Sequence, residues 1–128
     1  MSPKEVFNTP RLPAAKGPYS QAVRAGDLLF VSGLVGVNPQ TGAAAGDFRA
    51  QTRQVLENLR VLLTQAGGSL SDVVKTTVFL ADMRDFGALN EIYAAYFPTN
   101  APARSTIQAP PPSGFLVEIE AIALLPRQ

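Results

Sequence analysis

The feature that most constrains the fold is the regular alternation at the C-terminal end of the chain, from Phe115 to Leu125. Side chains of a β-strand alternate between two faces, so one face of this segment is apolar throughout: Phe115, Val117, Ile119, Ala121, Ala123 and Leu125. The opposite face mixes two carboxylates with aliphatic residues: Leu116, Glu118, Glu120, Ile122 and Leu124. The segment is therefore predicted to be a strand whose apolar face is covered by helices.

A helix over residues 48–66 is predicted to provide part of that cover. Its core-facing residues recur at steps of three and four and form one stripe: Phe48, Thr52, Val55, Leu56, Leu59, Leu62, Leu63 and Ala66. Asp47 is the expected N-cap, and Gly67-Gly68 provides a left-handed stop. On the solvent side, Arg53 and Glu57 are spaced as an i, i+4 ion pair.

The remaining elements complete the predicted order. A second helix is marked by Phe86, Leu89, Tyr93 and Phe97; it begins near Asp82 or Asp85 and ends before Pro98. β-branched and apolar runs predict further strands over residues 28–32, 73–80 and 103–109. The order of strands, helix, strand, helix and two strands indicates an α+β fold class. We expect a single domain over residues 1–128, with both helices on one face of the sheet.

The composition limits the chemistry and the partners. The chain has no His and no Cys, which excludes His-based triads, thiolate nucleophiles and the commonest metal ligands. We therefore expect neither a metal nor a cofactor. Eleven Lys and Arg against ten Asp and Glu leave a net charge of +1, so no nucleic-acid partner is expected. Residues 1–12 contain no apolar segment typical of a secretory signal, and no apolar run approaches the roughly 20 residues of a membrane span. These features predict a cytoplasmic protein without a membrane partner.

The two C-terminal strands carry the charged residues that could perform chemistry. If they form a hairpin that turns near Pro111, Arg104 lies close to Glu118 on the face away from the helices. Such a pair is either an exposed cross-strand ion pair, worth well under about 1 kcal/mol, or part of a site. The aliphatic residues beside Glu118 favour burial of this face against a partner subunit. We therefore predict a homo-oligomer with Arg104 and either Glu118 or Glu120 at or near the interface.

Four other residues are weaker candidates. Tyr19 lies in a Gly-Pro-rich loop, where it either presents a phenol or anchors the loop. Ser32 and Gly33 are predicted to end a strand, where a hydroxyl and free backbone N–H groups either bind an anion or form a turn. Asn90 is expected to make a polar surface contact from the second helix. Tyr93, Tyr96 and Phe97 are expected to be core aromatics.

Several segments resemble the RidA/YjgF family of reactive-intermediate deaminases, and together they extend over nearly the whole chain in the family's order. They are Leu12–Gln21, Phe30–Gly33, Val37–Gly42, Lys75–Phe79, Pro102–Ser105 and Glu118–Ala123. Members of that family are small trimeric hydrolases of 2-iminoacids. The resemblance implies a chorismate-mutase-like α+β fold, in which a mixed sheet backed by two helices closes into a trimeric barrel. It also implies three active sites in clefts between subunits.

The resemblance further implies roles for individual residues. Arg104 corresponds to the arginine that grips the substrate carboxylate, and Glu118 to the glutamate that positions or activates water. The other site positions that it implies are Tyr19, Ser32, Gly33, Asn90 and Thr106. Thr106 stands where many family deaminases have Cys, and the proline-rich loop Pro110–Gly114 is about one residue shorter than is common in the family. Both differences bear on the choice of substrate.

The leading functional hypothesis is the hydrolytic deamination of 2-iminoacids or their enamine tautomers, of the 2-iminobutanoate and 2-iminopropanoate type, to 2-oxoacids and ammonia. Arg104 would bind the α-carboxylate as a bidentate fork, and Glu118 would accept a proton from water. Partial burial and the neighbouring Glu120 are expected to raise the pKa of Glu118, and Arg104 to oppose that shift. The alternative is a trimer that binds small carboxylates or acts as a protein-interaction module without turnover.

Overall fold

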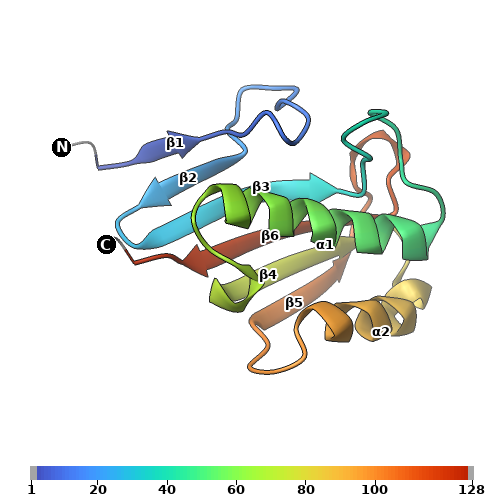
Figure 1. The fold of residues 1–128 in the computed structure, drawn as a ribbon. Coiled ribbons are helices and arrows are strands. Elements are labelled where there is room, and N and C mark those ends of the chain that lie inside the picture. Colours follow the sequence, from blue (N-terminus) through green and yellow to red (C-terminus); the bar gives the residue numbers. More distant parts are fainter. Residues whose placement is uncertain (1–2, 127–128) are drawn as a thin grey trace.

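A computed structural model describes residues 3–126 as one mixed sheet with two helices on the same face (Figure 1). The helices are α1 (Phe48–Gln65) and α2 (Phe86–Tyr96). The strands are β1 (Glu5–Phe7), β2 (Ala22–Ala25), β3 (Leu28–Val35), β4 (Val73–Leu80), β5 (Ala103–Gln108) and β6 (Val117–Leu124). Short 3-10 turns precede β4, α2 and β6. The predicted α+β class and the placement of both helices on one face are confirmed.

The strand order across the sheet is β1-β2-β3-β6-β4-β5. The C-terminal strand β6 lies in the middle, antiparallel to β3 on one side and to β4 on the other, while β5 pairs with β4 in parallel. The predicted hairpin between the last two strands is therefore wrong. A mostly apolar strand such as β6 is stabilised most when the backbone groups on both of its edges are hydrogen-bonded to neighbouring strands. The loop after β5 is long enough to carry the chain past β4 into that position.

The termini of the helices follow the sequence signals. The Asp47 side chain accepts a hydrogen bond from the Ala50 N–H at 2.9 Å and so caps α1. After the helix, Gly67 takes a positive φ of 94°, and the Gly68 N–H donates to the Leu63 carbonyl at 2.8 Å. Asp85 is the N-cap residue of α2 but makes no side-chain capping bond.

One predicted ion pair on α1 is replaced by another. Glu57 pairs with Arg60 at 3.7 Å, and no ion pair between Arg53 and Glu57 is formed in the described part of the chain. Both spacings bring side chains to neighbouring positions on a helix, so the choice between them is decided by nearby groups. Arg60 also lies over the ring of Tyr96, 5.3 Å from its centroid, and this contact favours its position beside Glu57.

The core lies between the helices and the inner face of the sheet. Its fully buried large side chains come from α1, α2 and the central strands: Leu29, Leu56, Leu59, Leu62, Leu63, Leu80, Leu89 and Ile119. The outer face of the sheet has no helix over it (Figure 1). Phe30 and Leu124 on that face are 42% and 44% exposed. Within residues 3–126, no helix is both long and apolar enough to cross a lipid bilayer.

Candidate active site

Glu118 lies near the start of β6, on the outer face of the sheet. It is half-buried, and its Cα partners are Val35 of β3 and Phe79 of β4. Burial raises the pKa of the Glu118 carboxyl, and repulsion from Glu120 raises it further. The predicted direction and both predicted causes are confirmed, whereas Arg104 has no part in the shift.

The Glu118 carboxylate fits against a position where β3 has no side chain. A Cβ on Gly33 would overlap the carboxylate, so glycine is needed here for close approach. The register between β3 and β6 shifts between Val31 and Leu34, which leaves Ser32 and Gly33 without Cα partners in β6. The prediction that the strand ends at Ser32 and Gly33 is therefore wrong: β3 continues through this irregularity to Val35.

Ser32 connects this region to the loop that carries Tyr19. The Ser32 hydroxyl donates to the Ser20 carbonyl at 2.6 Å, and the Ser32 N–H donates to the Gln21 carbonyl at 3.0 Å. Tyr19, which directly precedes Ser20 in this loop, is 55% exposed. We call Glu118, Gly33, Ser32 and Tyr19 the carboxylate half-site.

Gln21 holds this loop in place, a role that no sequence pattern predicted. Its buried side chain accepts from the Thr9 N–H at 2.7 Å and donates to the carbonyls of Thr9 and Pro13. Its own N–H donates to the Asn8 side chain. The sequence signal was present, since Gln21 closes the Gly-Pro-Tyr segment, but the bonds that it makes depend on tertiary structure.

Arg104 lies on β5, the edge strand at the other end of the sheet from β1. Its Nη2 donates to the Asn90 Oδ1 at 2.7 Å. The guanidinium carbon is 4.8 Å from the ring centroid of Tyr93 and 5.5 Å from that of Phe86. Thr106, two residues along β5, points to the same face of the sheet and is half-buried. We call Arg104, Asn90, Tyr93, Phe86 and Thr106 the arginine half-site.

The two half-sites lie apart within one chain. Arg104 is paired with Thr76 of β4, whose side chain is buried beneath the helices, whereas Glu118 is paired with Phe79, which points to the other face. Because β4 separates β5 from β6, the two backbones are about 10 Å apart across the sheet. The prediction that Arg104 and Glu118 share one face is wrong, because it depended on the hairpin that does not form.

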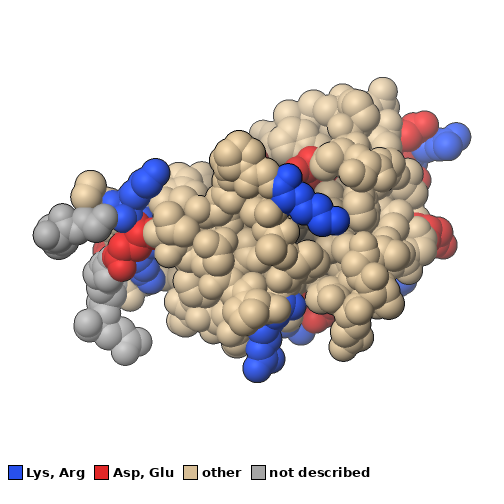
Figure 2. All heavy atoms as spheres, turned by 90° about the horizontal axis from the view of Figure 1, so that it is seen from above, with Lys and Arg blue, Asp and Glu red and all other residues tan. Residues whose placement is uncertain are grey.

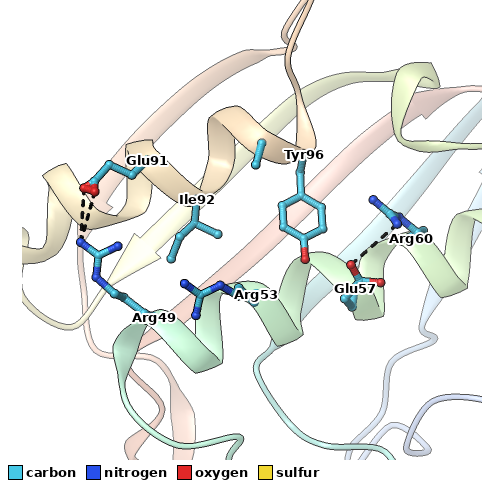
Figure 3. Close-up of a pocket in the computed structure, with 8 residues that line it drawn as sticks. Arg49, Arg53, Glu57, Arg60, Glu91, Ile92 and Tyr96 are labelled. Atoms are coloured by element: carbon cyan, nitrogen blue, oxygen red, sulfur yellow. Dashed lines mark hydrogen bonds and ion pairs between the residues drawn. The ribbon is translucent and has the colours of Figure 1, made fainter.

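A groove of about 510 Å³ lies between α1 and α2 (Figure 3). Arg49 and Arg60 in this groove pair with Glu91 and Glu57 respectively. Burial and a hydrogen bond with Glu57 raise the pKa of Tyr96, the aromatic wall of the groove, to about 12. Most of the charges in the groove are therefore neutralised by one another, and none of the predicted site residues lines it.

Charged side chains are sparse on the face seen in Figure 2. Viewed from above relative to Figure 1, the surface consists mostly of uncharged residue types, with Lys, Arg, Asp and Glu scattered over it. This distribution agrees with the net charge of +1. Among the residues that the structure describes, this face carries no extended basic surface of the kind that binds nucleic acid through its phosphates.

Comparison with known proteins decides the family. The model of the family described as "Endoribonuclease L-PSP" matches residues 9–125. The chain belongs to this family, which is the RidA/YjgF family. The resemblance found in the sequence segments is thereby confirmed.

Two relatives and one solved structure illustrate which proteins this chain is similar to. A RutC family protein of Pyrococcus horikoshii is 50% identical, over 94% of this chain and 97% of the relative. A 2-iminobutanoate/2-iminopropanoate deaminase of Mus musculus is 48% identical, over 94% of this chain and 91% of the relative. The crystal structure of RidA from an Antarctic Psychrobacter is 43% identical, with a TM-score of 0.91 over 94% of this chain and 99% of that one. The chain thus shares its fold and its family with proteins that are named as imine deaminases, while the P. horikoshii relative has only a family name.

Proposed function

We propose that this protein hydrolyses 2-iminoacids and their enamine tautomers to 2-oxoacids and ammonia, at a site shared between two copies of the chain. One copy supplies the arginine half-site and its neighbour supplies the carboxylate half-site. The observation that carries the proposal is that one sheet presents a prearranged guanidinium on one face and a carboxyl of raised pKa on the other. Relatives named as 2-iminobutanoate/2-iminopropanoate deaminases support the same chemistry.

Two features support assembly between copies. The half-sites cannot meet within one chain, because they face opposite sides of the sheet. The outer face, where Glu118 lies, also exposes Phe30 and Leu124, which gain free energy when a second copy covers them. A closed ring of three copies, as the family resemblance implies, would place one shared site at each interface.

Arg104 suits the binding of the substrate carboxylate. A guanidinium has five N–H donors in a planar fork, and one of the Arg104 donors is used by Asn90. The remaining donors can bind both oxygens of an α-carboxylate, which fixes the orientation of the neighbouring imine carbon. The aromatic rings below the guanidinium exclude water and strengthen this attraction.

Glu118 suits the activation of water. The water oxygen forms a bond to the imine carbon, one water proton passes to the Glu118 carboxylate, and the imine nitrogen takes up a proton to become an amine. The C–N bond of this tetrahedral intermediate then breaks. The amine nitrogen takes up a second proton and leaves as ammonia with the electron pair of the C–N bond, while the remaining hydroxyl loses its proton and becomes the carbonyl of the 2-oxoacid. Tyr19, Ser32 and the Gly33 backbone are proposed to surround the reacting carbon.

Mixing two inactive variants tests both the chemistry and the shared site. Arg104→Ala and Glu118→Gln are each expected to lose about 100-fold or more in kcat/KM with iminoacid generated in situ, measured as ammonia release. An equal mixture of the two chains, unfolded and refolded together, should recover about a quarter of the wild-type activity, because some interfaces then combine two intact half-sites. Each variant refolded alone is the control.

Other outcomes would overturn parts of the proposal. Near wild-type turnover by Arg104→Ala would remove the carboxylate anchor, and no recovery on mixing would contradict a site shared between two copies. Tight binding of 2-oxoacids by wild-type protein without ammonia release would favour the non-catalytic binder. RNA cleavage by the wild-type protein, abolished in Glu118→Gln, would favour the activity in the family description instead.

A further inference from the structure

We propose that Thr76 and Tyr93 form a buried hydroxyl pair that positions Arg104 for the carboxylate of the substrate. This inference rests on the proposed function, since it concerns the same arginine half-site. Thr76 and Tyr93 are positioning residues, because neither is required to touch the substrate.

The contact between the two hydroxyls lies inside the core. Thr76 Oγ1 and Tyr93 Oη are 2.7 Å apart, and either can be the donor. Thr76 is fully buried and Tyr93 is 6% exposed. Thr76 is also the residue of β4 that is paired with Arg104 in β5, so the hydroxyl pair lies directly beside the strand position that carries the arginine.

Packing alone does not explain a threonine at this position. The next two inward-facing residues of β4 are Val78 and Leu80, which are fully buried and apolar. Valine fills nearly the same volume as threonine and avoids the cost of burying a hydroxyl. Within the described residues, the Thr76 hydroxyl has one side-chain partner, Tyr93. The hydroxyl therefore stabilises one position of the Tyr93 ring.

The Tyr93 ring in turn supports the guanidinium of Arg104. The guanidinium carbon is closer to the ring centroid of Tyr93, at 4.8 Å, than to that of Phe86, at 5.5 Å. Burial raises the pKa of Tyr93, so the phenol keeps its proton at neutral pH. Together with the hydrogen bond to Asn90, the ring limits the number of rotamers that Arg104 samples before the ligand arrives.

Loss of the hydroxyl pair should weaken carboxylate binding more than turnover. We expect Thr76→Val and Tyr93→Phe each to raise KM, and the Ki of a 2-oxoacid, by about 3- to 10-fold while kcat changes little. The two effects should not add in the double variant, because either change breaks the same bond. Thr76→Ser, which keeps the hydroxyl, should restore most of the affinity.

A matched control separates this effect from general damage to the core. Thr52 is also fully buried, but its hydroxyl donates to the Phe48 carbonyl one turn earlier in α1, at 2.8 Å. Thr52→Val should leave KM and Ki unchanged. A 2-oxoacid amide, which lacks the carboxylate, should bind to Thr76→Val and to the wild type equally weakly.

A measurement that does not depend on activity completes the test. The side-chain NMR signals of Arg104 in free protein labelled with ¹⁵N-arginine report rotation of the guanidinium. We expect slow rotation in the wild type and in Thr52→Val, and faster rotation in Thr76→Val and Tyr93→Phe. Equal rotation in all four proteins, or unchanged Ki values in the two hydroxyl variants, would overturn the inference. If Arg104→Ala binds carboxylates normally, the proposed function fails, whereas the NMR comparison still shows whether the hydroxyl pair holds the arginine.

Discussion

The two half-sites hold charges of opposite sign by different means. Arg104 is fixed by partners from its own chain, namely the Asn90 amide and the rings of Tyr93 and Phe86. Glu118 is shaped by the space at Gly33, and within residues 3–126 its carboxylate has neither a hydrogen bond nor an ion pair. The arginine half-site is therefore prearranged in a single copy, whereas the carboxylate half-site leaves its charged group available to water, ligand or a neighbouring copy.

Apart from the removal of Arg104 or Glu118 itself, the largest effect is expected at Gly33, where shape alone holds the carboxylate. In Gly33→Ala the added Cβ would displace the Glu118 carboxylate, which is the end of a flexible side chain. We expect kcat/KM to fall about 100-fold, because small displacements of a reacting group are that costly, with little loss of thermal stability. Steady-state kinetics and thermal unfolding of the same sample check this. Gly87→Ala, whose new Cβ would meet nothing within 4 Å, is the control and should keep full activity.

The next effect is expected when the fork of the arginine half-site is replaced. Arg104→Lys keeps the charge but loses the bidentate geometry and the stacking on Tyr93. We expect kcat/KM to fall roughly 10-fold, mainly through KM. Arg84→Lys, at an exposed position beside α2, is the matched control. A kcat effect without a KM effect would contradict the assignment of Arg104 to carboxylate binding.

A smaller effect is expected from the charge next to Glu118. Glu120→Gln removes the repulsion that helps to raise the pKa of Glu118, so that pKa should fall. Since the proposed base must be ionised, the acid limb of the pH profile of kcat/KM should move to lower pH. An unchanged profile would show that Glu118 does not control that limb.

The same raised pKa predicts how stability depends on pH. A carboxyl whose pKa is higher in the folded state binds more protons there than in the unfolded state, so its contribution to stability is lost as pH rises through the folded pKa. Glu118→Gln should therefore raise the melting temperature above that pH and change it little at lower pH. Thermal unfolding of the variant and the wild type across the acid range tests this. A lower melting temperature at neutral pH would contradict the prediction.

The smallest effect is expected in the groove between the helices, outside both half-sites. Arg49 Nη2 and Glu91 are 3.3 Å apart and largely exposed (Figure 3). Arg49→Gln should lower the free energy of unfolding by less than about 1 kcal/mol, and less still in high salt, without changing the kinetics. A large loss of activity would show that the groove takes part in function after all.

Local patterns predicted both helices and four of the six strands of the described residues, and missed β1 and β2. The stripe over residues 48–66, the Asp47 cap and the stop at Gly67 depend on neighbours within one or two turns, and all three are confirmed. The alternation over residues 115–125 correctly identified the buried and outer faces of β6. The resemblance of short segments to the RidA/YjgF family was confirmed by comparison along the chain.

The pairing of strands was not predictable in the same way. The hairpin assumption failed because which strand lies beside β6 depends on the closing of the whole sheet, and the loop before β6 permits more than one neighbour. The irregularity at Ser32 and Gly33 and the role of Gln21 were missed for the same reason. Their partners are distant in sequence.

By itself, the sequence determined the two helices, four of the six strands of the described residues and the two faces of β6, and it singled out Arg104 and Glu118 as the proposed site residues. These follow from short-range periodicity, since a side chain's face is set by its position in its own element. Only the tertiary structure decided that the arginine and the carboxylate point away from each other. That outcome depends on how β5 and β6 each pair with β4, which lies between them, and this pairing is fixed by long-range burial of a shared core rather than by any local signal.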